Sequence, residues 1–544
     1  MEREVIAFFT PELAIHNDLH TYCGGLGVFS GGFLHSAAKA GLPLVGVTIL
    51  PREGYYDQVV DRERRAMKVE FVKRYYDGLL EDTGVQFSLD LVSSPVRVKV
   101  WRLPGSRYAT SPVYFLDTDV PENDYVSRLN TLQLYGGSRQ NGANLDRAIA
   151  QALVLGKGGF EALKQLGIKV RLYHLNESHA FYLAMEIFHS LLEEGKSEAE
   201  ATALTRKQLV FTTHTPVPAG NPEYPPYEIH RFASWNGVLP ADAVTRLFGD
   251  PMNTAGACLR LAGKANAVSE KHCSVAKKLW AWVEGAPPLD YITNGVDRDF
   301  WQQPEFANAA TAEELGRAKR FWKRNLLRFV SDTTERRVQL SENVPTLTWA
   351  RRFAEYKRPK LLFYDADEAG GIAQLLKENR VQVLIAGKPH PDDFQMIDTW
   401  NDLYRMSFEL PNLVVLPEYD LSMSKLLKSG SDLWLNTPRA PDEACGTSGM
   451  SAAMNGALNI STPDGWMSEA NEENAFLFGS GTRMTGQDAY DAEKLHTALG
   501  AALELYGDQD ALLAKAMCAK QEAETRWTTD RMVGEYASKL YELR

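Results

Sequence analysis

Residues 433–451 read LWLNTPRAPDEACGTSGMS, and the change of pattern within this stretch decides the fold class. Leu433 to Asn436 is a short apolar run typical of a buried strand. The residues that follow are polar and rich in turn formers, and a helix is expected to open at the small residues 446–449. A strand that passes through a turn into a helix is typical of a parallel sheet wrapped by helices.

The same alternation of short apolar runs and longer helical patterns extends over the whole chain. It predicts an α/β protein with two sets of strands and with helices between them, such as 145–166 and 181–194. The first set of expected strands comprises Val5–Phe9, Leu44–Leu50, Val113–Leu116, Val170–His174 and Gln208–Thr212. The second set comprises Thr346–Ala350, Val381–Ala386, Leu413–Leu416, Leu433–Asn436 and Gly456–Ser461.

The length of the chain and its hydrophobic content indicate two large domains. The 544 residues are 44% hydrophobic, which is ample for two well-filled cores. The stretch Asp290–Trp301 contains an Asn-Gly pair and has little periodicity, so we expect the chain to pass between domains there. We therefore expect an N-terminal domain at 1–297 and a C-terminal domain at 298–520. A last helix at 521–544 is expected to cross back to the first domain.

Charge, cysteine usage and hydropathy argue against several classes of partner. The formal charge of −11 disfavours nucleic acid and anionic membranes. Five scattered cysteines with no CxxC pair suit a reducing compartment. No apolar run reaches the roughly 18 residues of a membrane helix, and the N-terminus lacks a signal-peptide pattern. We therefore expect a cytoplasmic protein. We also expect no metal site, because the polar stretch His174–His179 lacks the spacing of a zinc-binding helix.

The first candidate site is a glycine loop at residues 24–27, GGLG, ahead of the helical run Gly32–Ala40. Glycine amides are unhindered and a helix start attracts negative charge, so Gly24, Gly25 and Leu26 are candidates to contact an anionic group. The loop also nearly matches the dinucleotide fingerprint, but a serine stands at its third glycine position. Taken alone, the loop fits a plain tight turn about as well.

The second candidate site is the basic segment 351–358, RRFAEYKR, which follows the expected strand Thr346–Ala350 and is expected to lead into a helix. Ligands of open α/β sheets bind at the carboxyl ends of strands, so Arg352 and Lys357 would face a ligand there. An Arg fork beside a Lys charge suits a phosphate or diphosphate and stabilises charge on a leaving group. The alternative is a solvated basic helix start, which the position at a strand end makes less favoured.

The third candidate site is the turn after Leu433–Asn436. Glu443 can accept hydrogen bonds from sugar hydroxyls, although an acid near a helix start also compensates the helix dipole. The backbone amides expected to bind anionic or hydroxyl oxygens are those of Gly446, Thr447, Ser448 and Gly449.

His214 lies in a Thr-His-Thr-Pro stretch directly after the expected strand Gln208–Thr212. Its position at a strand end suits a contact in the same cleft. A histidine there is about as often a structural residue, so this assignment depends on the other candidate sites.

Together these segments resemble the α-glucan phosphorylases, the glycogen and maltodextrin phosphorylases, especially their shorter prokaryotic form. The segments that carry the resemblance are 8–12, 22–27, 41–56, 174–181, 211–220, 292–301, 352–358 and 434–465. The resemblance implies a retaining glucosyl transferase with the GT-B architecture, in which two Rossmann-like α/β domains face a central cleft.

The resemblance also assigns roles to the candidate residues. It implies that Gly24, Gly25 and Leu26 contact the sugar and phosphate. Arg352 and Lys357 are implied to bind the substrate phosphate, and Arg351 is implied to lie near the cofactor phosphate. The donor sugar is assigned to Glu443, Gly446 and Thr447, and His214 is implied to lie near the reacting face.

The sequence departs from this family at the lysine that carries pyridoxal phosphate. That lysine directly follows a methionine in the family, whereas Ser451 follows Gly449-Met450 here. A serine hydroxyl cannot form an imine, and no lysine occurs between Lys428 and Lys494. A Schiff base at this position is therefore excluded, and we expect no such cofactor.

These expectations combine into one hypothesis of function. We expect a retaining transferase of a hexosyl group, in the first place glucosyl, from a nucleotide diphosphate-sugar donor to a sugar or other hydroxyl acceptor. The second phosphate of the donor would occupy the region of the missing cofactor. Residues 443–446 resemble a turn of GT-B synthases, including glycogen synthases, which use no pyridoxal phosphate.

Two alternatives stay open, and a dehydrogenase ranks last. One is an α-glucan phosphorylase with altered or noncovalent cofactor use, and the other is a catalytically inactive carbohydrate-binding relative. The acceptor, the nucleotide base, the exact hexose and the formation of a homo-oligomer are not predicted by the sequence.

Overall fold

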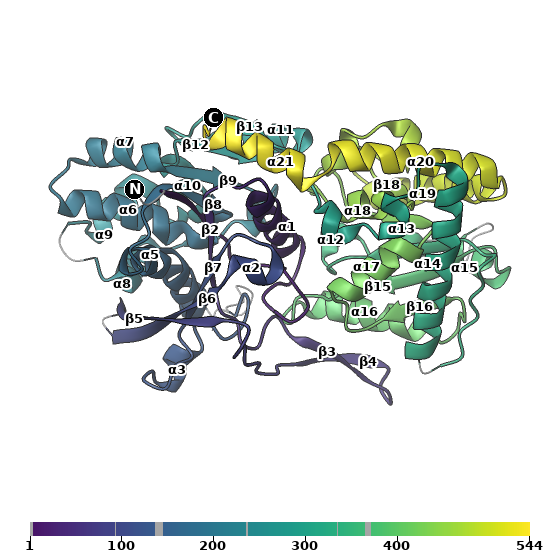
Figure 1. Cartoon of the computed structure of the whole chain (residues 1–544), viewed down its shortest axis with the longest axis horizontal. Coiled ribbons are helices and arrows are strands. Elements are labelled where there is room, and N and C mark those ends of the chain that lie inside the picture. Colours follow the sequence, from purple (N-terminus) through teal and green to yellow (C-terminus); the bar gives the residue numbers. More distant parts are fainter. Residues whose placement is uncertain are drawn as a thin grey trace. The chain divides into compact units, whose positions relative to one another are not determined.

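The chain forms two compact units in the computed structural model, which describes residues 4–92, 94–136, 145–235, 238–334, 336–364 and 371–543. The first unit comprises Met1–Tyr55, Phe71–Ile292 and Met532–Arg544, and the second comprises Tyr56–Glu70 and Thr293–Arg531. Each unit is built around a sheet of its own (Figure 1). The domain limits expected after residues 297 and 520 stay predictions.

The first unit contains a nine-stranded sheet in the order β13-β12-β9-β8-β1-β2-β7-β6-β5. The pairs from β13 to β7 are parallel, and β6 and β5 extend the sheet by antiparallel pairing. Its strands are β1 Val5–Phe9, β2 Leu44–Ile49, β5 Glu81–Leu91, β6 Ser94–Leu103, β7 Val113–Asp117, β8 Val170–Asn176, β9 Leu209–Thr212, β12 Lys264–Ala267 and β13 Leu289–Tyr291. Strands β2 and β7 are buried at every position, as expected of strands covered on both faces.

Helices lie between strands of this unit along the chain. They are α1 Gly25–Lys39, α2 Gly105–Tyr108, α3 Tyr125–Arg128, α4 Leu145–Leu153, α5 Gly159–Gln165, α6 Phe181–Glu193, α7 Glu198–Gln208, α8 Pro226–Ala233, α9 Ala241–Phe248, α10 Thr254–Leu261 and α11 Glu270–Leu279. A π-helical turn at Val154–Gly158 joins α4 to α5, so the helix expected over 145–166 is continuous. A short antiparallel pair of β10 Glu223–Tyr224 and β11 Met252–Asn253 lies apart from the main sheet.

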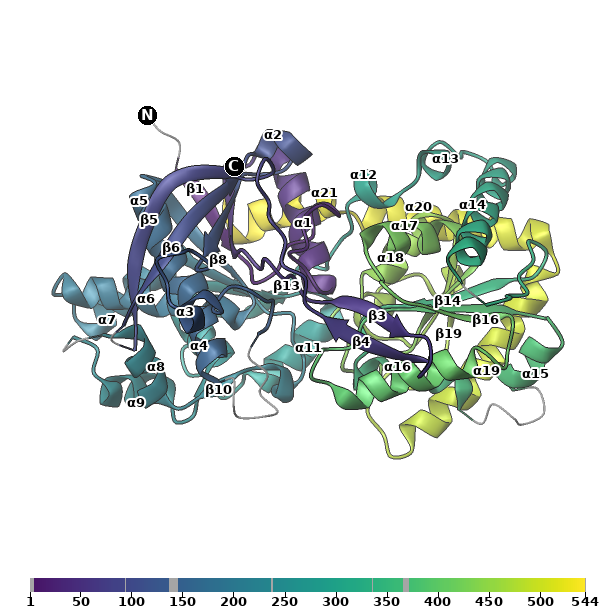
Figure 2. The same cartoon turned by 90° about the horizontal axis from the view of Figure 1, so that it is seen from below.

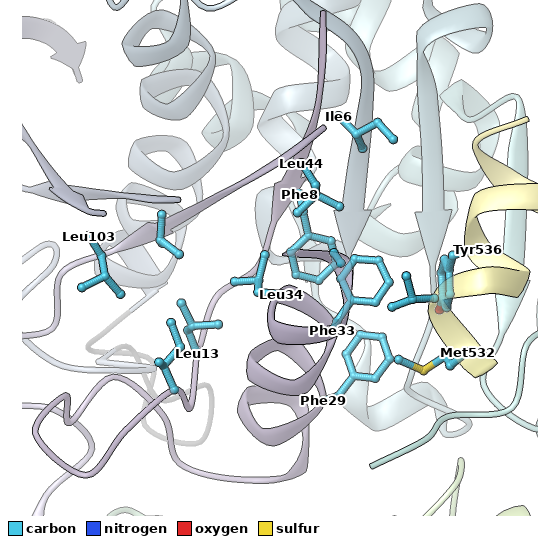
Figure 3. Packing of buried hydrophobic residues seen from close by; sticks show 14 of the residues in the cluster. Ile6, Phe8, Leu13, Phe29, Phe33, Leu34, Leu44, Leu103, Met532 and Tyr536 are labelled. Carbon is cyan, nitrogen blue, oxygen red and sulfur yellow. The ribbon is translucent and has the colours of Figure 1, made fainter. Parts of the chain in front are cut away.

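A buried aromatic core holds helix α1 in the first unit. The rings of Phe8 on β1 and Phe33 on α1 are stacked with their centroids 4.9 Å apart. Tyr536 follows α21, Thr529–Glu535, and its ring meets the Phe33 ring edge-on at 5.1 Å. Figure 3 shows Tyr536 and Met532 beside Phe29 and Phe33 in this core. The end of the chain therefore packs on the helix that begins at the glycine loop.

The second unit contains a six-stranded sheet in the order β16-β15-β14-β17-β18-β19, and every pair in it is parallel. The strands are β14 Thr346–Ala350, β15 Gln382–Ala386, β16 Leu413–Leu416, β17 Leu433–Asn436, β18 Leu458–Ser461 and β19 Ala475–Leu477. The helices are α12 Arg298–Trp301, α13 Pro304–Ala307, α14 Ala312–Thr333, α15 Ile372–Lys377, α16 Phe394–Met406, α17 Leu421–Gly430, α18 Ser448–Met454, α19 Gln487–Tyr506 and α20 Gln509–Arg526.

A hairpin from the N-terminal part of the chain belongs to the second unit. Its strands are β3 Asp57–Asp61 and β4 Ala66–Glu70, and β4 packs against α16 (Figure 2). The backbone N–H of Met67 donates to Asn401 Oδ1 at 2.8 Å. The hairpin and the antiparallel strands β5 and β6 were not among the strands expected from the sequence.

The α/β class with parallel sheets is confirmed, and two local predictions are wrong. The helix after the glycine loop begins at Gly25 and not at Gly32, because close packing of α1 on the preceding loop requires glycines: a Cβ at Gly31 would lie 1.8 Å from Ala14 O. Residues 355–357 inside the basic segment and Leu361–Phe363 just after it form short 3-10 turns where a helix was expected.

Two classes of feature were searched among the described residues. None of their helices is both long and apolar enough to cross a membrane. Within the same residues, no group of three or more His, Cys, Asp or Glu side chains is placed to hold a metal ion.

Replacement of Tyr536 by alanine is expected to destabilise the first unit. The side chain is fully buried, and its hydroxyl accepts a hydrogen bond from Asn266 Nδ2 at 3.1 Å. Tyr536→Ala should lower the free energy of unfolding by about 3–5 kcal/mol, measured by urea unfolding. Tyr536→Phe keeps the ring and should cost about 1 kcal/mol. Equal transition midpoints for wild type and Tyr536→Ala would contradict this packing.

Candidate functional site

Polar side chains of the first unit gather where β1 and β8 end. Asn176, the last residue of β8, donates through Nδ2 to Thr10 Oγ1 at 3.1 Å and to Ser30 Oγ at 3.0 Å. Thr10 follows β1 and Ser30 lies in α1, so one amide joins two strand ends to the helix. This arrangement follows from the parallel sheet, because the carboxyl ends of its strands share one edge.

His214 lies at the same edge, just after β9. Its Nε2 is 2.7 Å from Asn176 Oδ1, and its ring meets the Phe29 ring edge-on at 4.8 Å. Because Asn176 Oδ1 only accepts, Nε2 carries the proton and Nδ1 is left as an acceptor. Burial lowers the pKa of His214 well below its usual value, so the ring is neutral at pH 7.

Glu177 fixes the backbone on which His214 stands. Its Oε1 accepts from the His214 backbone N–H at 2.5 Å and from Thr215 Oγ1 at 2.8 Å, and Oε2 accepts from the Ser178 N–H at 3.1 Å. Glu177 itself has φ of 71°. This backbone conformation is unfavourable in free energy for any residue that carries a Cβ. The sequence predicts only a polar cleft lining for the stretch 174–179, and the positive φ of Glu177 is not readable from it.

A second carboxylate, Glu12, holds the glycine loop. Glu12 Oε2 accepts from the backbone N–H groups of Cys23 at 2.6 Å and Gly24 at 3.0 Å. The Gly24 amide expected to contact an anion is therefore engaged by protein. Gly25 and Leu26 form the first helical residues of α1, and a Cβ added at Gly24 or Gly25 would meet nothing within 4 Å. Their contact with a ligand stays a prediction.

The basic segment of the second unit leaves the carboxyl end of β14 and lies between two other strand ends. Its Phe353 N–H donates to Lys388 O at 3.0 Å in the loop after β15. On the other side, Arg358 donates through Nε to Thr437 O at 2.9 Å and through Nη2 to Pro438 O at 2.9 Å, in the loop after β17. The segment is thus fixed by neighbouring loops in place of the expected helix.

The two adjacent arginines of this segment differ in environment. Arg351 is buried, and its Nη2 donates to Ser448 Oγ at 3.3 Å. The Nε of Arg351 has no hydrogen-bond acceptor among the described residues. Arg352 is exposed, and its charge contributes with burial to lowering the pKa of His390. The buried guanidinium that faces the third candidate site is therefore that of Arg351.

Lys357 and Glu443 form an ion pair that joins the second and third candidate sites. Their side chains are 12% and 9% exposed. The backbone N–H of Glu443 donates to Asp464 Oδ2 at 2.9 Å, and Asp464 Oδ1 accepts from the Gly465 N–H at 3.0 Å. Asp464 is thus a positioning residue for the turn that carries Glu443, and the sequence analysis did not name it.

The small residues after Glu443 make the turn into α18. Gly446 has φ of 79°, which favours glycine, and Thr447 precedes the first residue of α18. Ser448 Oγ accepts from Arg351 and from Trp434 Nε1, the latter at 3.4 Å. A Cβ at Gly449 would lie 2.5 Å from Asn459 Oδ1, so this glycine allows close packing.

Ser451 lies inside α18 and is fully packed. It is 1% exposed, and its hydroxyl donates to Ser448 O at 3.0 Å. Helix α18, Ser448–Met454, contains no amine, so the residues present do not fit pyridoxal phosphate held as a Schiff base on this helix.

The chain is similar in sequence to carbohydrate phosphorylases. The carbohydrate phosphorylase family profile matches residues 302–537. The chain is 39% identical over 541 residues to an uncharacterized protein of Methanocaldococcus jannaschii, covering 98% of this chain and 99% of that protein. It is 30% identical over 598 residues to a maltodextrin phosphorylase of Thermococcus litoralis, covering 99% of this chain and 70% of that enzyme. It is 33% identical over 543 residues to a glycogen phosphorylase of Mycobacterium tuberculosis, covering 85% of this chain and 61% of that enzyme.

His174 and His214 of the first unit are expected not to titrate between pH 5 and 8. Burial lowers the pKa of His174 to about 3 and that of His214 well below 6.5. Both rings are neutral in the folded chain and become protonated in the unfolded chain below about pH 6.5. The free energy of unfolding should therefore fall as pH drops from about 6.5 towards the folded-state pKa values. Histidine-labelled NMR, with His214→Asn to assign one signal, measures this. A midpoint near pH 6.5 for either ring would refute the burial argument.

Proposed function

The chain belongs to the carbohydrate phosphorylase family, and from this premise we propose that it transfers a hexosyl group, in the first place glucosyl, with retention of anomeric configuration. It is a glycosyltransferase, as are its phosphorylase relatives. We further propose that it works without covalent pyridoxal phosphate, uses a nucleotide diphosphate-sugar donor and has a sugar or other hydroxyl compound as acceptor. A GT-B arrangement of the two units and a cytoplasmic location are parts of the same proposal.

The Lys357–Glu443 ion pair is the observation that carries the proposal. Each partner suits one half of an activated sugar: the lysine suits a phosphate, and the carboxylate suits sugar hydroxyls. The two charges neutralise each other, and both side chains are largely buried. A donor that brings both groups can replace both halves of the pair, so neither charge is left buried and unpaired.

Arg351 supports a donor with two phosphates. Its buried guanidinium lies beside Ser448, and its Nε has no hydrogen-bond acceptor among the described residues, whereas Lys357 is paired with Glu443. We propose that Arg351 takes the second phosphate of a nucleotide diphosphate and that Lys357 and Arg352 offset the charge of the departing group. The leaving phosphate would then receive the proton of the acceptor hydroxyl.

The candidate residues of the first unit have positioning roles in this proposal. Glu177 and Asn176 hold a neutral His214 whose Nδ1 accepts a hydrogen bond, which suits a sugar hydroxyl. Gly25 and Leu26 at the start of α1 are proposed to contact the sugar or its phosphate. Gly446, Thr447 and Gly449 are proposed to shape the donor-sugar side of the other unit.

Ser451 favours the proposed function over its main alternative. An α-glucan phosphorylase would need altered or noncovalent cofactor use, because α18 offers a hydroxyl where an imine needs an amine. A catalytically inactive relative is disfavoured, since the Arg351, Lys357 and Glu443 constellation is held in place by neighbouring strand ends.

Turnover assays distinguish these functions. The purified protein is tested in three assays. The first contains a glucan acceptor and a nucleotide sugar, the second contains the glucan and glucose 1-phosphate, and the third contains the glucan and inorganic phosphate. Transfer is expected with the nucleotide sugar and absent in the two phosphorylase assays. Phosphorolysis that depends on added pyridoxal phosphate would contradict the proposal, and inactivity with every donor would favour the inactive relative.

Lys357→Met is expected to lower kcat by about 10²–10³-fold, because it removes one group that stabilises charge on the leaving phosphate. Glu443→Gln should chiefly weaken donor binding, since the amide replaces a carboxylate that accepts from sugar hydroxyls. Lys360→Met is the matched control, because Lys360 is exposed and pairs with the exposed Asp402 at 2.6 Å. Full activity of Lys357→Met in steady-state assays would show that the site is misassigned.

A further inference from the structure

The C-terminal turn, residues 536–541, brings two tyrosine hydroxyls into the interior of the first unit. A π-helical turn at Tyr536–Leu540 follows α21, and Tyr541 comes directly after it. The side chains of Tyr536 and Tyr541 are both buried. The backbone carbonyl of Tyr541 accepts from Arg171 Nη2 at 3.0 Å, and Arg171 lies on β8. The C-terminal turn is therefore attached to the sheet of this unit.

A series of hydrogen bonds leads from Tyr541 across two neighbouring strands. The Tyr541 hydroxyl lies 2.6 Å from Nδ1 of His174 on β8, and His174 Nε2 lies 2.8 Å from Oγ1 of Thr212, the last residue of β9. Thr212 Oγ1 donates to Asn266 Oδ1 at 2.6 Å, and Asn266 Nδ2 donates to the Tyr536 hydroxyl at 3.1 Å. The series therefore begins and ends on the C-terminal turn.

The partners in this series determine which atoms carry the protons. Thr212 gives its one hydroxyl proton to Asn266 Oδ1, so its oxygen accepts from His174 Nε2. Nδ1 of His174 then carries no proton and accepts from the Tyr541 hydroxyl. Burial lowers the pKa of His174 to about 3, so the ring is neutral at pH 7. Removal of the Tyr541 hydroxyl would take from this buried acceptor the donor that the structure gives it.

The two strands that His174 and Thr212 join also carry polar residues of the candidate site. Asn176 follows His174 by two positions, and His214 follows Thr212 by two positions. Asn176 and Thr212 are paired in the register of β8 and β9, and the Glu177 N–H donates to Thr212 O at 3.0 Å. The hydrogen bond from His214 Nε2 to Asn176 Oδ1 therefore joins the same two strand ends as the buried series.

An aromatic contact reaches His214 from the same C-terminal turn. The centroid of the Tyr536 ring lies 6.5 Å from that of Phe29, and the Phe29 ring meets the His214 ring edge-on at 4.8 Å. Tyr536 and Phe29 belong to one buried core (Figure 3). The His214 ring thus contacts Asn176 and Phe29, and the C-terminal turn packs behind both of them.

We propose that Tyr541 is a positioning residue for the candidate site of the first unit: through His174 and Thr212 it holds the ends of β8 and β9, so that Asn176 fixes the His214 ring. The effect on the His214 ring depends on contacts within this unit, whereas its consequence for glycosyl transfer rests on the proposed function. Loss of one hydroxyl in the C-terminal turn should therefore loosen the loop that carries His214.

Hydrogen exchange of the full chain, followed by mass spectrometry of its peptides, tests this role. Tyr541→Phe keeps the buried ring and removes only the hydroxyl. The backbone N–H groups of Glu177, Thr213 and His214 are all hydrogen-bonded in the folded chain. In Tyr541→Phe they should exchange about tenfold faster, as expected where the loss of one buried hydrogen bond eases local opening.

The matched control is Tyr182→Phe. Tyr182 is also buried in the first unit, and its hydroxyl donates to Ile229 O at 3.0 Å, outside the series. This variant also loses one buried hydrogen bond, but it should leave the exchange of the Glu177, Thr213 and His214 amides unchanged. Equal acceleration of these amides in both variants overturns the proposal, because a general loss of stability would then explain it.

Variants at Thr212 test the hydroxyl in the middle of the series. Thr212→Val keeps the shape of the side chain without its hydroxyl and should accelerate exchange at Glu177, whereas Thr212→Ser retains the hydroxyl and should keep it slow. Because both changes break one series, Tyr541→Phe with Thr212→Val should exchange no faster than Thr212→Val alone. Additive effects, or equal rates for the valine and serine variants, overturn the proposal. The Thr212 pair gives this result even if Tyr541→Phe does not fold.

Histidine-labelled NMR measures a property of the His214 ring that a general loss of stability leaves unchanged. In wild type the ring should show one tautomer, with the proton on Nε2, because Asn176 Oδ1 accepts from it. In Tyr541→Phe the tautomer with the proton on Nδ1 should become detectable, and in Tyr182→Phe it should stay absent. A single His214 tautomer in Tyr541→Phe overturns the proposal.

Transfer assays separate this inference from the proposed function. Under the proposed function, Tyr541→Phe should raise the KM for the nucleotide sugar about tenfold at unchanged kcat, because a hydroxyl contact to His214 acts in the ground state and the transition state alike. An unchanged KM in an active enzyme overturns the positioning role. Failure of nucleotide sugars as donors, with exchange and NMR as expected, rejects the proposed function and leaves this inference standing.

Discussion

In each unit the candidate residues depend on one constraint, the common direction of parallel strands. Because parallel strands end at the same edge, loops that are distant in the sequence meet there. Thr10, Asn176 and His214 follow or end three strands of the first unit and are joined by hydrogen bonds. In the second unit, the segments that begin at Arg351 and Thr437 meet in the same way. The sheets thus bring together groups that no local sequence pattern holds.

Partners within the protein explain how the carboxyl-terminal edge of each sheet can hold charged side chains. Lys357 and Glu443 neutralise each other, and Glu177 places a carboxylate against backbone N–H groups in the first unit. Burial raises the pKa of Glu177, while the hydrogen bonds it accepts oppose that change. Each of these groups of residues is therefore ordered by its own contacts.

Much of the fold was predictable from the sequence because parallel, doubly covered strands are short continuous apolar runs. The ranges Val5–Phe9, Thr346–Ala350, Leu413–Leu416 and Leu433–Asn436 match the observed strands. The antiparallel strands β5 and β6 were missed because they alternate buried and exposed positions and carry many charges. The family resemblance was confirmed, whereas the residue roles taken from it stay predictions.

Other features depend on contacts that are distant in the sequence. Helix α1 begins early because its glycines allow the preceding loop to pack on it, although glycine is a poor helix former. The prediction of a helix after the basic segment is wrong for two reasons. Arg358 has φ of 49°, and its side chain donates to a backbone carbonyl in the loop after β17. The residue after Arg358 is a proline. Glu12 and Asp464 were not identified from the sequence, because each acts through hydrogen bonds to residues distant along the chain.

The central claim is that the second unit holds a donor with two phosphates and needs no Schiff base. Isothermal titration calorimetry with a nucleoside diphosphate, the expected leaving group, measures this claim directly. The account predicts saturable binding of one nucleoside diphosphate per chain and its loss in Arg351→Met. Absence of nucleoside diphosphate binding in a protein that binds glucose 1-phosphate would contradict it.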